Sequence, residues 1–390
     1  LRAGGTAADA AIAVNAMLGL VEPMSCGIGC DLFAIYLDNK EKKLYGLNAS
    51  GRSPYKISRE LFNKRNLKQI PINGPLSWSV PGCVSGWEAL AERFGNKSLA
   101  DLLAPAITTG REGFPVSEII ASSWHGAAGS LQKHAGSAAT YLVEGKRAPR
   151  FGEVFRNSQL AHSYQLIGEQ GAHVFYRGEI AQELVRFSDQ EGGLFTDKDF
   201  QDHTVQWVQP VSTNYRGYDV WELPPNGQGI AALEILNLLE PYDIRKMGPG
   251  SPEYLHLFIE AKKLAFADRA KYYSDPDFNQ LPINQLISKQ YAKEQGKRID
   301  VKKAAANVQA GDPKLQKGDT VYLSVVDKDR NCCSLIQSNY FGFGSQLTPK
   351  KLGFAIQNRG ALFALDDDHL NRLEPHKRPF HTIIPAMVTK

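Results

Sequence analysis

The pattern of hydrophobic and polar positions predicts strands near both ends of the chain and helices between them. Short apolar runs at 32–38 and 43–48 flank a polar turn and predict a hairpin. A second such pair lies at 320–327 and 332–340. Residues 252–273 carry an imperfect apolar stripe with helical spacing and predict the longest helix. Because strands and helices are segregated rather than alternating, the fold class predicted is α+β.

Other segments carry weaker signals. Thr6 followed by Asp9 resembles a capping box, so a helix should begin near residue 6. Further helices are expected over 85–94, 98–110, 116–143, 157–169, 178–187 and 230–240, and strands over 207–215 and 218–223. Pro105 should kink or shorten its helix. The chain begins with Leu1, and the last strand, from residue 381, has no evident partner, so we expect a fragment or a processed piece.

Composition excludes several classes of protein. Hydrophobic residues make up 43% of the 390 residues and charged residues 22%, which excludes disordered, collagen-like and coiled-coil chains. No apolar run reaches the roughly 18 residues that a membrane span needs. A net charge of +4 is too balanced for a nucleic-acid surface, so we expect no nucleic-acid partner. Five cysteines are too few and too scattered for a disulfide framework.

Familiar cofactor and metal motifs are weak or absent. Residues 227–232 match the G-x-G-x-x-A pattern, but no strand ending in an acidic residue follows, so a structural turn is favoured over dinucleotide binding. The sequence has no C-x-x-C, H-E-x-x-H or G-x-S-x-G motif. Cys26 and Cys30 are better explained as small buried hydrophobes than as metal ligands.

Thr320 is the most informative candidate for catalysis. It opens a predicted strand after Gly318 and Asp319, although a threonine at the start of a strand is usually structural. A threonine hydroxyl becomes a good nucleophile when the free α-amino group of the same residue acts as its base, and that requires chain cleavage before Thr320. The hairpin should bring Ser338 towards Thr320. Without further information Ser338 is an ordinary strand serine.

Several short motifs, each weak alone, occur here in a specific order. They are GGTAADAAIA at 4–13, EPMSCGIG at 22–29, Pro81-Gly82 with Gly86, FTD at 195–197, PPNGQG at 224–229, Glu260 with AFADR at 265–269, GDTVY at 318–322, SVVD at 324–327 and KRP at 377–379. In this combination the chain resembles the γ-glutamyltranspeptidase, or glutathione hydrolase, family. It is most similar to the glutathione hydrolase-like branch that merges with the cephalosporin acylases.

The resemblance implies an N-terminal-nucleophile hydrolase with an αββα sandwich. The precursor would cut itself between Asp319 and Thr320, leaving residues 1–319 as the large subunit and 320–390 as the start of the small one. Thr320 would be the nucleophile, and Ile336 and Ser338 would take the places of a threonine and an asparagine beside it. Substrates would be small γ-glutamyl or other acyl amides, with water or an amine as acceptor. No metal or organic cofactor is implied.

The chain departs from the family pattern around the expected substrate site. Ser50 stands where γ-glutamyl-specific members have an arginine, with Arg52 two residues later. In the QNRGAL stretch at 357–362, Arg359 and Leu362 stand where polar and acidic groups are expected. The substrate-binding candidates are Arg52, Asn358, Arg359, His381 and Thr382. An acylase for glutaryl-type amides and a non-catalytic relative therefore remain alternatives. The family's oxyanion Gly-Gly pair lies downstream of this sequence.

Overall fold

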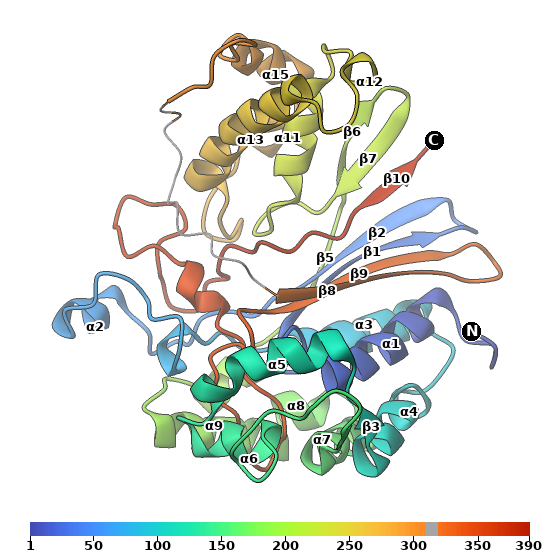
Figure 1. The fold of residues 1–390 in the computed structure, drawn as a ribbon, viewed down its shortest axis with the longest axis vertical. Helices are drawn as coiled ribbons and strands as arrows, with labels where there is room; N and C mark the ends of the chain where they lie inside the picture. Colours follow the sequence, from blue (N-terminus) through green and yellow to red (C-terminus); the bar gives the residue numbers. More distant parts are fainter. Residues whose placement is uncertain (307, 309–318) are drawn as a thin grey trace.

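The computed structural model describes residues 1–306, 308 and 319–390. Two antiparallel sheets lie face to face between two layers of helices (Figure 1). The larger sheet has the order β5-β2-β1-β9-β8, and the smaller has the order β10-β7-β6. This is the αββα sandwich expected for an N-terminal-nucleophile hydrolase.

The helices form two groups. The layer below the larger sheet contains α1 (Ala7–Val21), α3 (Cys83–Phe94), α4 (Leu99–Glu112), α5 (Glu118–Leu131), α6 (Ala135–Tyr141), α7 (Ser158–Gln170), α8 (His173–Tyr176) and α9 (Glu179–Glu191). The layer above the smaller sheet contains α11 (Gly229–Leu239), α12 (Ile244–Met247), α13 (Pro252–Tyr272) and α15 (Lys289–Gly296). The sequence analysis missed α2 (Arg59–Lys64), α8, α10 (Asp197–Gln201), α12, α14 (Ile283–Leu286) and α15.

Both predicted hairpins are confirmed. In the larger sheet, β1 (Asp31–Asp38) pairs with β2 (Lys43–Ala49) on one side and with β9 (Cys332–Tyr340) on the other. β8 (Asp319–Val326) then pairs with β9 at the edge of the sheet. A two-residue pair, β3 (Phe114–Pro115) with β4 (Val154–Phe155), lies apart from the sandwich sheets.

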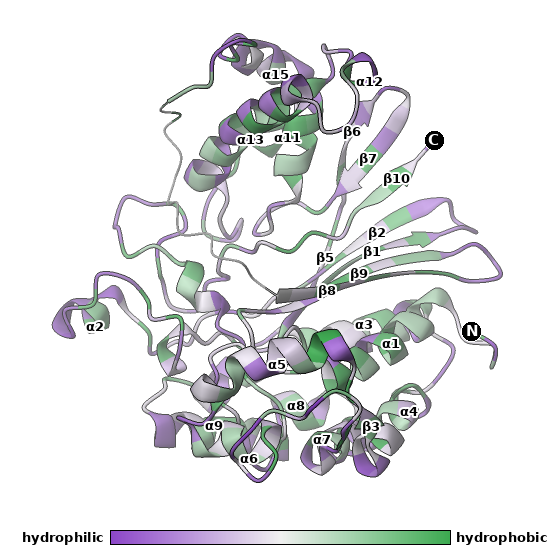
Figure 2. Cartoon of the chain, in the orientation of Figure 1, coloured by the Kyte–Doolittle hydropathy of each residue, from purple (hydrophilic) through white to green (hydrophobic). Residues whose placement is uncertain are grey.

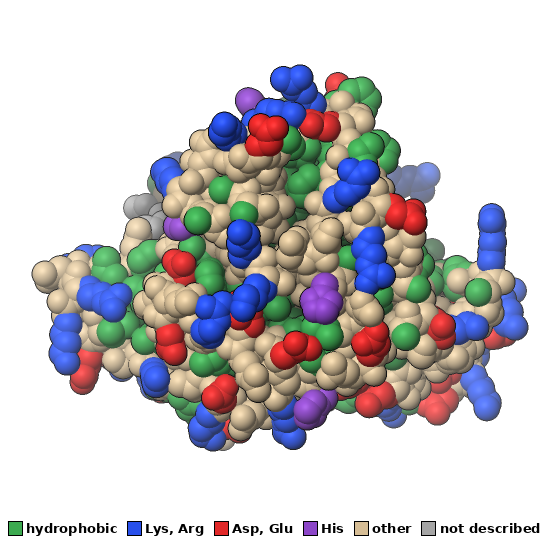
Figure 3. Space-filling view, turned by 90° about the horizontal axis from the view of Figure 1, so that it is seen from below, with side chains coloured by type: hydrophobic (Ala, Val, Ile, Leu, Met, Phe, Trp, Pro, Cys, Tyr) green, Lys and Arg blue, Asp and Glu red, His purple; other side chains and the backbone are tan. Residues whose placement is uncertain are grey.

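Alternation along β1 places its side chains in two different cores. Leu32, Ala34 and Tyr36 belong to the cluster shared with the lower helices. Phe33 and Ile35 pack with residues of the smaller sheet and of the segment that precedes β10. Hydrophilic residues lie on the outer surfaces of the lower helices, for example on α9 (Figure 2). Seen from below, acidic and basic side chains are interspersed over this layer (Figure 3).

Two strand predictions need correction. The expected strand at 207–215 is split into β5 (Gln206–Val208) and β6 (Val211–Tyr215), which belong to different sheets. Pro210 lies at the break and cannot donate a ladder hydrogen bond. The closing strand is shorter than expected, only β10 (Met387–Thr389), and it does have a partner, because it pairs with β7 (Tyr218–Glu222).

Local helix signals fared better. The capping box of α1 is present: Asp9 N donates to Thr6 Oγ1 at 3.2 Å, and Thr6 N donates to Asp9 Oδ2 at 2.8 Å. Pro105 lies inside α4 without shortening it. The carbonyl that loses its partner belongs to Asp101, which is exposed to water. All five cysteines are free, as expected, and no helix among the described residues is long and apolar enough to cross a membrane.

Candidate active site

A β-bulge surrounds Thr320. Asp319 pairs with Tyr340 and Val321 with Gln337, so Thr320 alone faces the two intervening residues, Ser338 and Asn339. Bulges bend a strand and redirect side chains, and they are common beside active sites. Thr320 is exposed. The register thus brings Thr320 and Ser338 together, while the cleavage hypothesis itself stays a prediction.

The two residues opposite Thr320 differ in their contacts. Ser338 is buried, and its Oγ accepts a hydrogen bond from Tyr340 N at 2.9 Å. Asn339 Nδ2 donates to the carbonyls of Pro23 and Met24 at 3.1 and 3.2 Å. The amide of Asn339 therefore fastens the loop before β1. Ser338 lies two positions after Ile336, which packs towards the smaller sheet, so strand alternation places Ser338 on that face.

Asp31, which the sequence analysis missed, connects the strand that carries Ser338 with the segment that carries His381. It is fully buried at the start of β1 and is the register partner of Ser338. Its Oδ1 accepts from Gly51 N at 2.9 Å and from Gln357 Nε2 at 2.8 Å, and its Oδ2 lies 2.7 Å from His381 Nε2. One signal could have identified it: a carboxylate heading a strand that is otherwise apolar must be paired when buried.

His381 is held as a neutral ring. Burial and, to a smaller extent, the nearby Arg359 cation lower its pKa to about 4, although the hydrogen bond and charge of Asp31 act in the opposite direction. A carboxylate can only accept hydrogen bonds, so the proton of the neutral ring lies on His381 Nε2, which donates to Asp31. Nδ1 is then an acceptor, and it has no hydrogen-bond partner among the described residues. His381 therefore offers the site a lone pair rather than a positive charge.

Arg359 is a buried cation with unused donors. Its side chain is fully buried, and its Nη1 donates to Thr382 Oγ1 at 2.8 Å. The guanidinium carbon lies 4.6 Å from the centre of the Tyr340 ring. Nε and Nη2 have no hydrogen-bond partner among the described residues. Burial lowers the pKa of Arg359 to about 10, so the group is still charged at neutral pH. Such a cation is suited to bind an anion.

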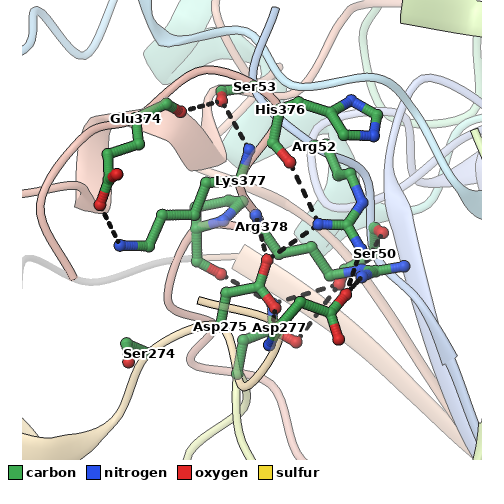
Figure 4. Close-up of polar contacts among 12 residues, drawn as sticks. Ser50, Arg52, Ser53, Ser274, Asp275, Asp277, Glu374, His376, Lys377 and Arg378 are labelled. Carbon is green, nitrogen blue, oxygen red and sulfur yellow. Dashed lines mark hydrogen bonds and ion pairs between the residues drawn. The ribbon is translucent and has the colours of Figure 1, made fainter. Parts of the chain in front are cut away.

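Arg52 and Asn358 make contacts within the protein. Arg52 Nη1 lies 3.0 Å from Asp275 Oδ2, and its other terminal nitrogen pairs with Asp277 (Figure 4). Asn358 Nδ2 donates to Ile72 O at 2.9 Å. The structure thus groups Arg359, His381 and Thr382, whereas Arg52 and Asn358 fasten neighbouring segments. Their predicted role in binding substrate stays a prediction.

The ion pairs in Figure 4 hold the segment that leads to His381. Arg378 N donates to Asp275 Oδ2 at 2.8 Å, and Arg378 Nε donates to Ser50 O at 3.1 Å. Ser50 is buried, and its hydroxyl donates to Asn48 Oδ1 at 2.6 Å. Ser50 is therefore part of the framework that holds this segment.

A pocket of about 440 Å³ adjoins this cluster. Tyr340 forms part of its wall, with the guanidinium of Arg359 against the ring. Leu362 and Asp366 also line it, whereas Asp367 is paired with Arg59 at 2.7 Å. The rest of the lining consists of Lys68, Gln69, Ile70, Ile72, Arg269, Ala270, Tyr273, Ala361, Phe363, Ala364, Leu365, His369, Asn371 and Phe380.

The αββα sandwich, with a threonine of its edge strand opposite a β-bulge in β9, defines the chain as an N-terminal-nucleophile hydrolase. The sequence profile of the family described as gamma-glutamyltranspeptidase matches residues 1–390, and the chain belongs to this family. It is 40% identical to the glutathione hydrolase-like YwrD proenzyme of Bacillus subtilis (strain 168), over 99% of this chain and 72% of that protein. It is 34% identical to the acylase ACY 1 proenzyme of Pseudomonas sp. (strain SE83), over 100% and 71%.

A solved structure agrees with this assignment. The cephalosporin acylase from Bacillus halodurans superimposes with a TM-score of 0.91 at 41% identity, covering 100% of this chain and 72% of that one. The similar proteins thus include glutathione hydrolase-like and acylase proenzymes. The class that they share is a self-processing amidohydrolase.

A buried carboxyl beside the pocket predicts how stability depends on pH. Tyr273, which lines the pocket, donates to Glu234 Oε1 at 2.6 Å. Burial raises the pKa of Glu234 from 4.5 to about 9. The folded state then keeps a proton that the unfolded state loses, so the free energy of unfolding should fall as pH rises from 4.5 towards 9, by at most about 1.4 kcal/mol per pH unit.

Melting temperatures of wild type and Glu234→Gln between pH 5 and 9 test this prediction. The glutamine variant should lose less stability than wild type as pH rises. Glu294→Gln, at an exposed carboxylate paired with Lys297 at 2.7 Å, is the matched control and should follow wild type. Parallel curves for Glu234→Gln and wild type would contradict a raised pKa at Glu234.

Proposed function

We propose that the chain is a self-processing threonine amidohydrolase for amides whose acyl group carries a free carboxylate. The two substrate classes are γ-glutamyl amides such as glutathione and glutaryl-type amides. The observation that carries this proposal is Arg359, a buried guanidinium behind a pocket wall, two of whose nitrogens have no hydrogen-bond partner in the described part of the chain. That wall is Tyr340, whose register partner Asp319 immediately precedes Thr320.

In the proposed maturation, the Thr320 hydroxyl attacks the carbonyl carbon of Asp319. The acyl group moves from nitrogen to oxygen, and water hydrolyses the ester. The products are a carboxylate on Asp319 and a free α-amino group on Thr320. Residues 1–319 then form the large subunit, and the small subunit begins at Thr320. Names of relatives that include the word proenzyme support this step.

The new amino group acts as the base in turnover. It removes the proton of Thr320 Oγ as this oxygen attacks the substrate carbonyl, and it returns the proton to the leaving amine. Water or a second amine then cleaves the acyl ester. Ser338, opposite Thr320 in the bulge, positions the nucleophile with its hydroxyl.

Glutaryl-type acylase activity is supported by one specific difference. The family resemblance matches Leu362 to the acidic group expected to hold an α-ammonium. Leu362 lines the pocket, and His381 is neutral. The cluster therefore offers more to a carboxylate than to an ammonium. A non-catalytic relative is the remaining alternative, against which the exposed Thr320 argues.

Anilides that differ only in the acyl group test the proposal. We expect the purified, processed protein to hydrolyse glutaryl and γ-glutamyl 4-nitroanilide, and to be much slower on butyryl 4-nitroanilide, which lacks the carboxylate. Equal rates on all three would contradict a carboxylate site, and no hydrolysis of any would favour the non-catalytic alternative.

Activity should not require a metal ion. Among the described residues no group of three or more histidine, cysteine or acidic side chains could hold one, and the proposed base is the amino group of Thr320. The hydrolysis rate should be unchanged after dialysis against a chelator. A loss of rate that zinc restores would show that a metal takes part.

A further inference from the structure

A second buried arginine, Arg269 of α13, lies on the wall of the same pocket. Its exposed fraction is 7%, and it forms no ion pair with any described carboxylate. Its Nη1 donates to Gln228 Oε1 at 2.9 Å. Burial lowers its pKa, which shows that the charged form is held at a cost. An anion in the pocket would offset that cost.

Aromatic rings fix the orientation of this guanidinium. Its central carbon lies 4.1 Å from the ring centre of Phe266 and 5.3 Å from that of Phe380. Stacked and anchored at one nitrogen, Arg269 has little freedom left to lose when it binds a ligand. A fixed, desolvated arginine with donors left over is a suitable carboxylate receptor.

The two arginines occupy different parts of the site. Arg269 comes from the upper helical layer, and Arg359 from the segment that follows β9. They are linked through Gln228, whose Nε2 donates to Thr382 O at 2.6 Å, and through Thr382, whose hydroxyl accepts from Arg359. Tyr340, whose ring contacts Arg359, lines the pocket together with Arg269. One bound molecule can therefore meet both arginines through different groups.

The pocket is also larger than an acyl group requires. Its volume of about 440 Å³ falls in the range that suits a whole small ligand. Lys68 is exposed, and Asp366 is the one carboxylate among the described residues that line the pocket. Apolar side chains, including Ile70 and Phe363, make up much of the remainder. This lining matches an apolar leaving group that carries an anion.

We propose that Arg269 binds a carboxylate on the leaving-group side of the scissile amide, so that preferred substrates carry one carboxylate on each side of that bond. This inference rests on the proposed function, in which Arg359 holds the carboxylate of the acyl group. Arg269 is then a specificity-determining residue for the leaving amine.

Two chromogenic substrates with the same acyl group test the inference. Glutaryl 3-carboxy-4-nitroanilide carries the second carboxylate, and glutaryl 4-nitroanilide lacks it. For the wild-type enzyme kcat/KM should be higher for the carboxylated anilide by a factor of about 10–150, the value of one charged hydrogen bond. Arg269→Gln should bring this ratio close to one, because it lowers kcat/KM far more for the carboxylated anilide than for the plain one. Lys271→Gln, which removes an exposed charge from the same helix, should keep the ratio.

The outcomes separate this inference from the proposed function. If both anilides are hydrolysed equally by wild type, Arg269 does not select the leaving group, and the proposed function stands. If neither is hydrolysed, the proposed function fails and this inference fails with it. If Arg269→Gln lowers both rates equally, the arginine is only structural. If Arg269→Gln does not fold, Arg269→Lys replaces it in the test, because lysine keeps the charge but loses the planar guanidinium. If Arg269→Lys has the wild-type ratio of kcat/KM values and the wild-type kcat/KM on the carboxylated anilide, the guanidinium of Arg269 does not bind the carboxylate of the leaving group.

Discussion

Replacing Thr320 with alanine should leave the chain uncut and without amidase activity. Wild-type protein should run as two bands on a denaturing gel, and mass spectrometry should show that the smaller piece begins with Thr320. The alanine variant should run as one band, because the hydroxyl that attacks the carbonyl of Asp319 is missing. Removing both nucleophile and base should lower kcat by a factor on the order of 10⁶, as nucleophile loss does in other covalent hydrolases.

The exposed position of Thr320 separates an effect on catalysis from an effect on folding. Thr320 is exposed at the edge of the larger sheet, so its replacement removes little packing, and the alanine variant should melt close to the wild-type temperature. Ser324→Ala removes an exposed hydroxyl from the same strand and should be cut normally. Thr320→Ser keeps a hydroxyl and should still be cut. An uncut wild-type chain with full activity, or an alanine variant that is still cut, would contradict the assignment of Thr320.

Features set by neighbouring residues could be predicted from the sequence. The capping box of α1 depends on Thr6 and Asp9, three positions apart, and both of its hydrogen bonds are present. The two hairpins depend on alternation around a short turn, and both are formed as predicted. The αββα sandwich could be predicted only from the family's motifs. The segregation of strands and helices by itself predicts no more than the α+β fold class.

Features set by distant residues could not be predicted. Asp31 and His381 are 350 positions apart, and no local pattern in the sequence indicates that this carboxylate and this ring form a hydrogen bond. β10 pairs with β7, which lies far away in the sequence: Trp221 of β7 and Thr389 of β10 form a hydrogen bond and are 168 positions apart. The contact between Arg359 and the Tyr340 ring joins two segments that no local pattern connects. The candidate site was thus foreseeable in its residue types but not in its contacts.

The prediction that separates the two substrate classes concerns the α-ammonium of a glutamyl donor. A γ-glutamyl group carries a carboxylate and an ammonium on its α-carbon, and a glutaryl group carries the carboxylate alone. Leu362 cannot pair with an ammonium, and His381 is neutral. We therefore expect kcat/KM for γ-glutamyl and glutaryl anilides to be similar on the same preparation. A dedicated γ-glutamyl enzyme, with one more charged contact, should exceed this one by a factor of about 10–150 on the glutamyl substrate.

Variants of Arg359 and Asp366 identify what holds each charge. Arg359→Gln removes the cation that both acyl groups need, so kcat/KM should fall by about 10–150-fold on both substrates, while self-cleavage, which uses no external carboxylate, should persist. Asp366→Asn should leave both rates unchanged, because its exposed carboxylate is screened by water. A preference for the γ-glutamyl anilide above about a hundredfold that disappears in Asp366→Asn would instead show that Asp366, from the pocket wall, replaces the acidic group lost at Leu362. In that case the site would be a γ-glutamyl site with a relocated carboxylate, and Arg359 would still carry the other half of the recognition.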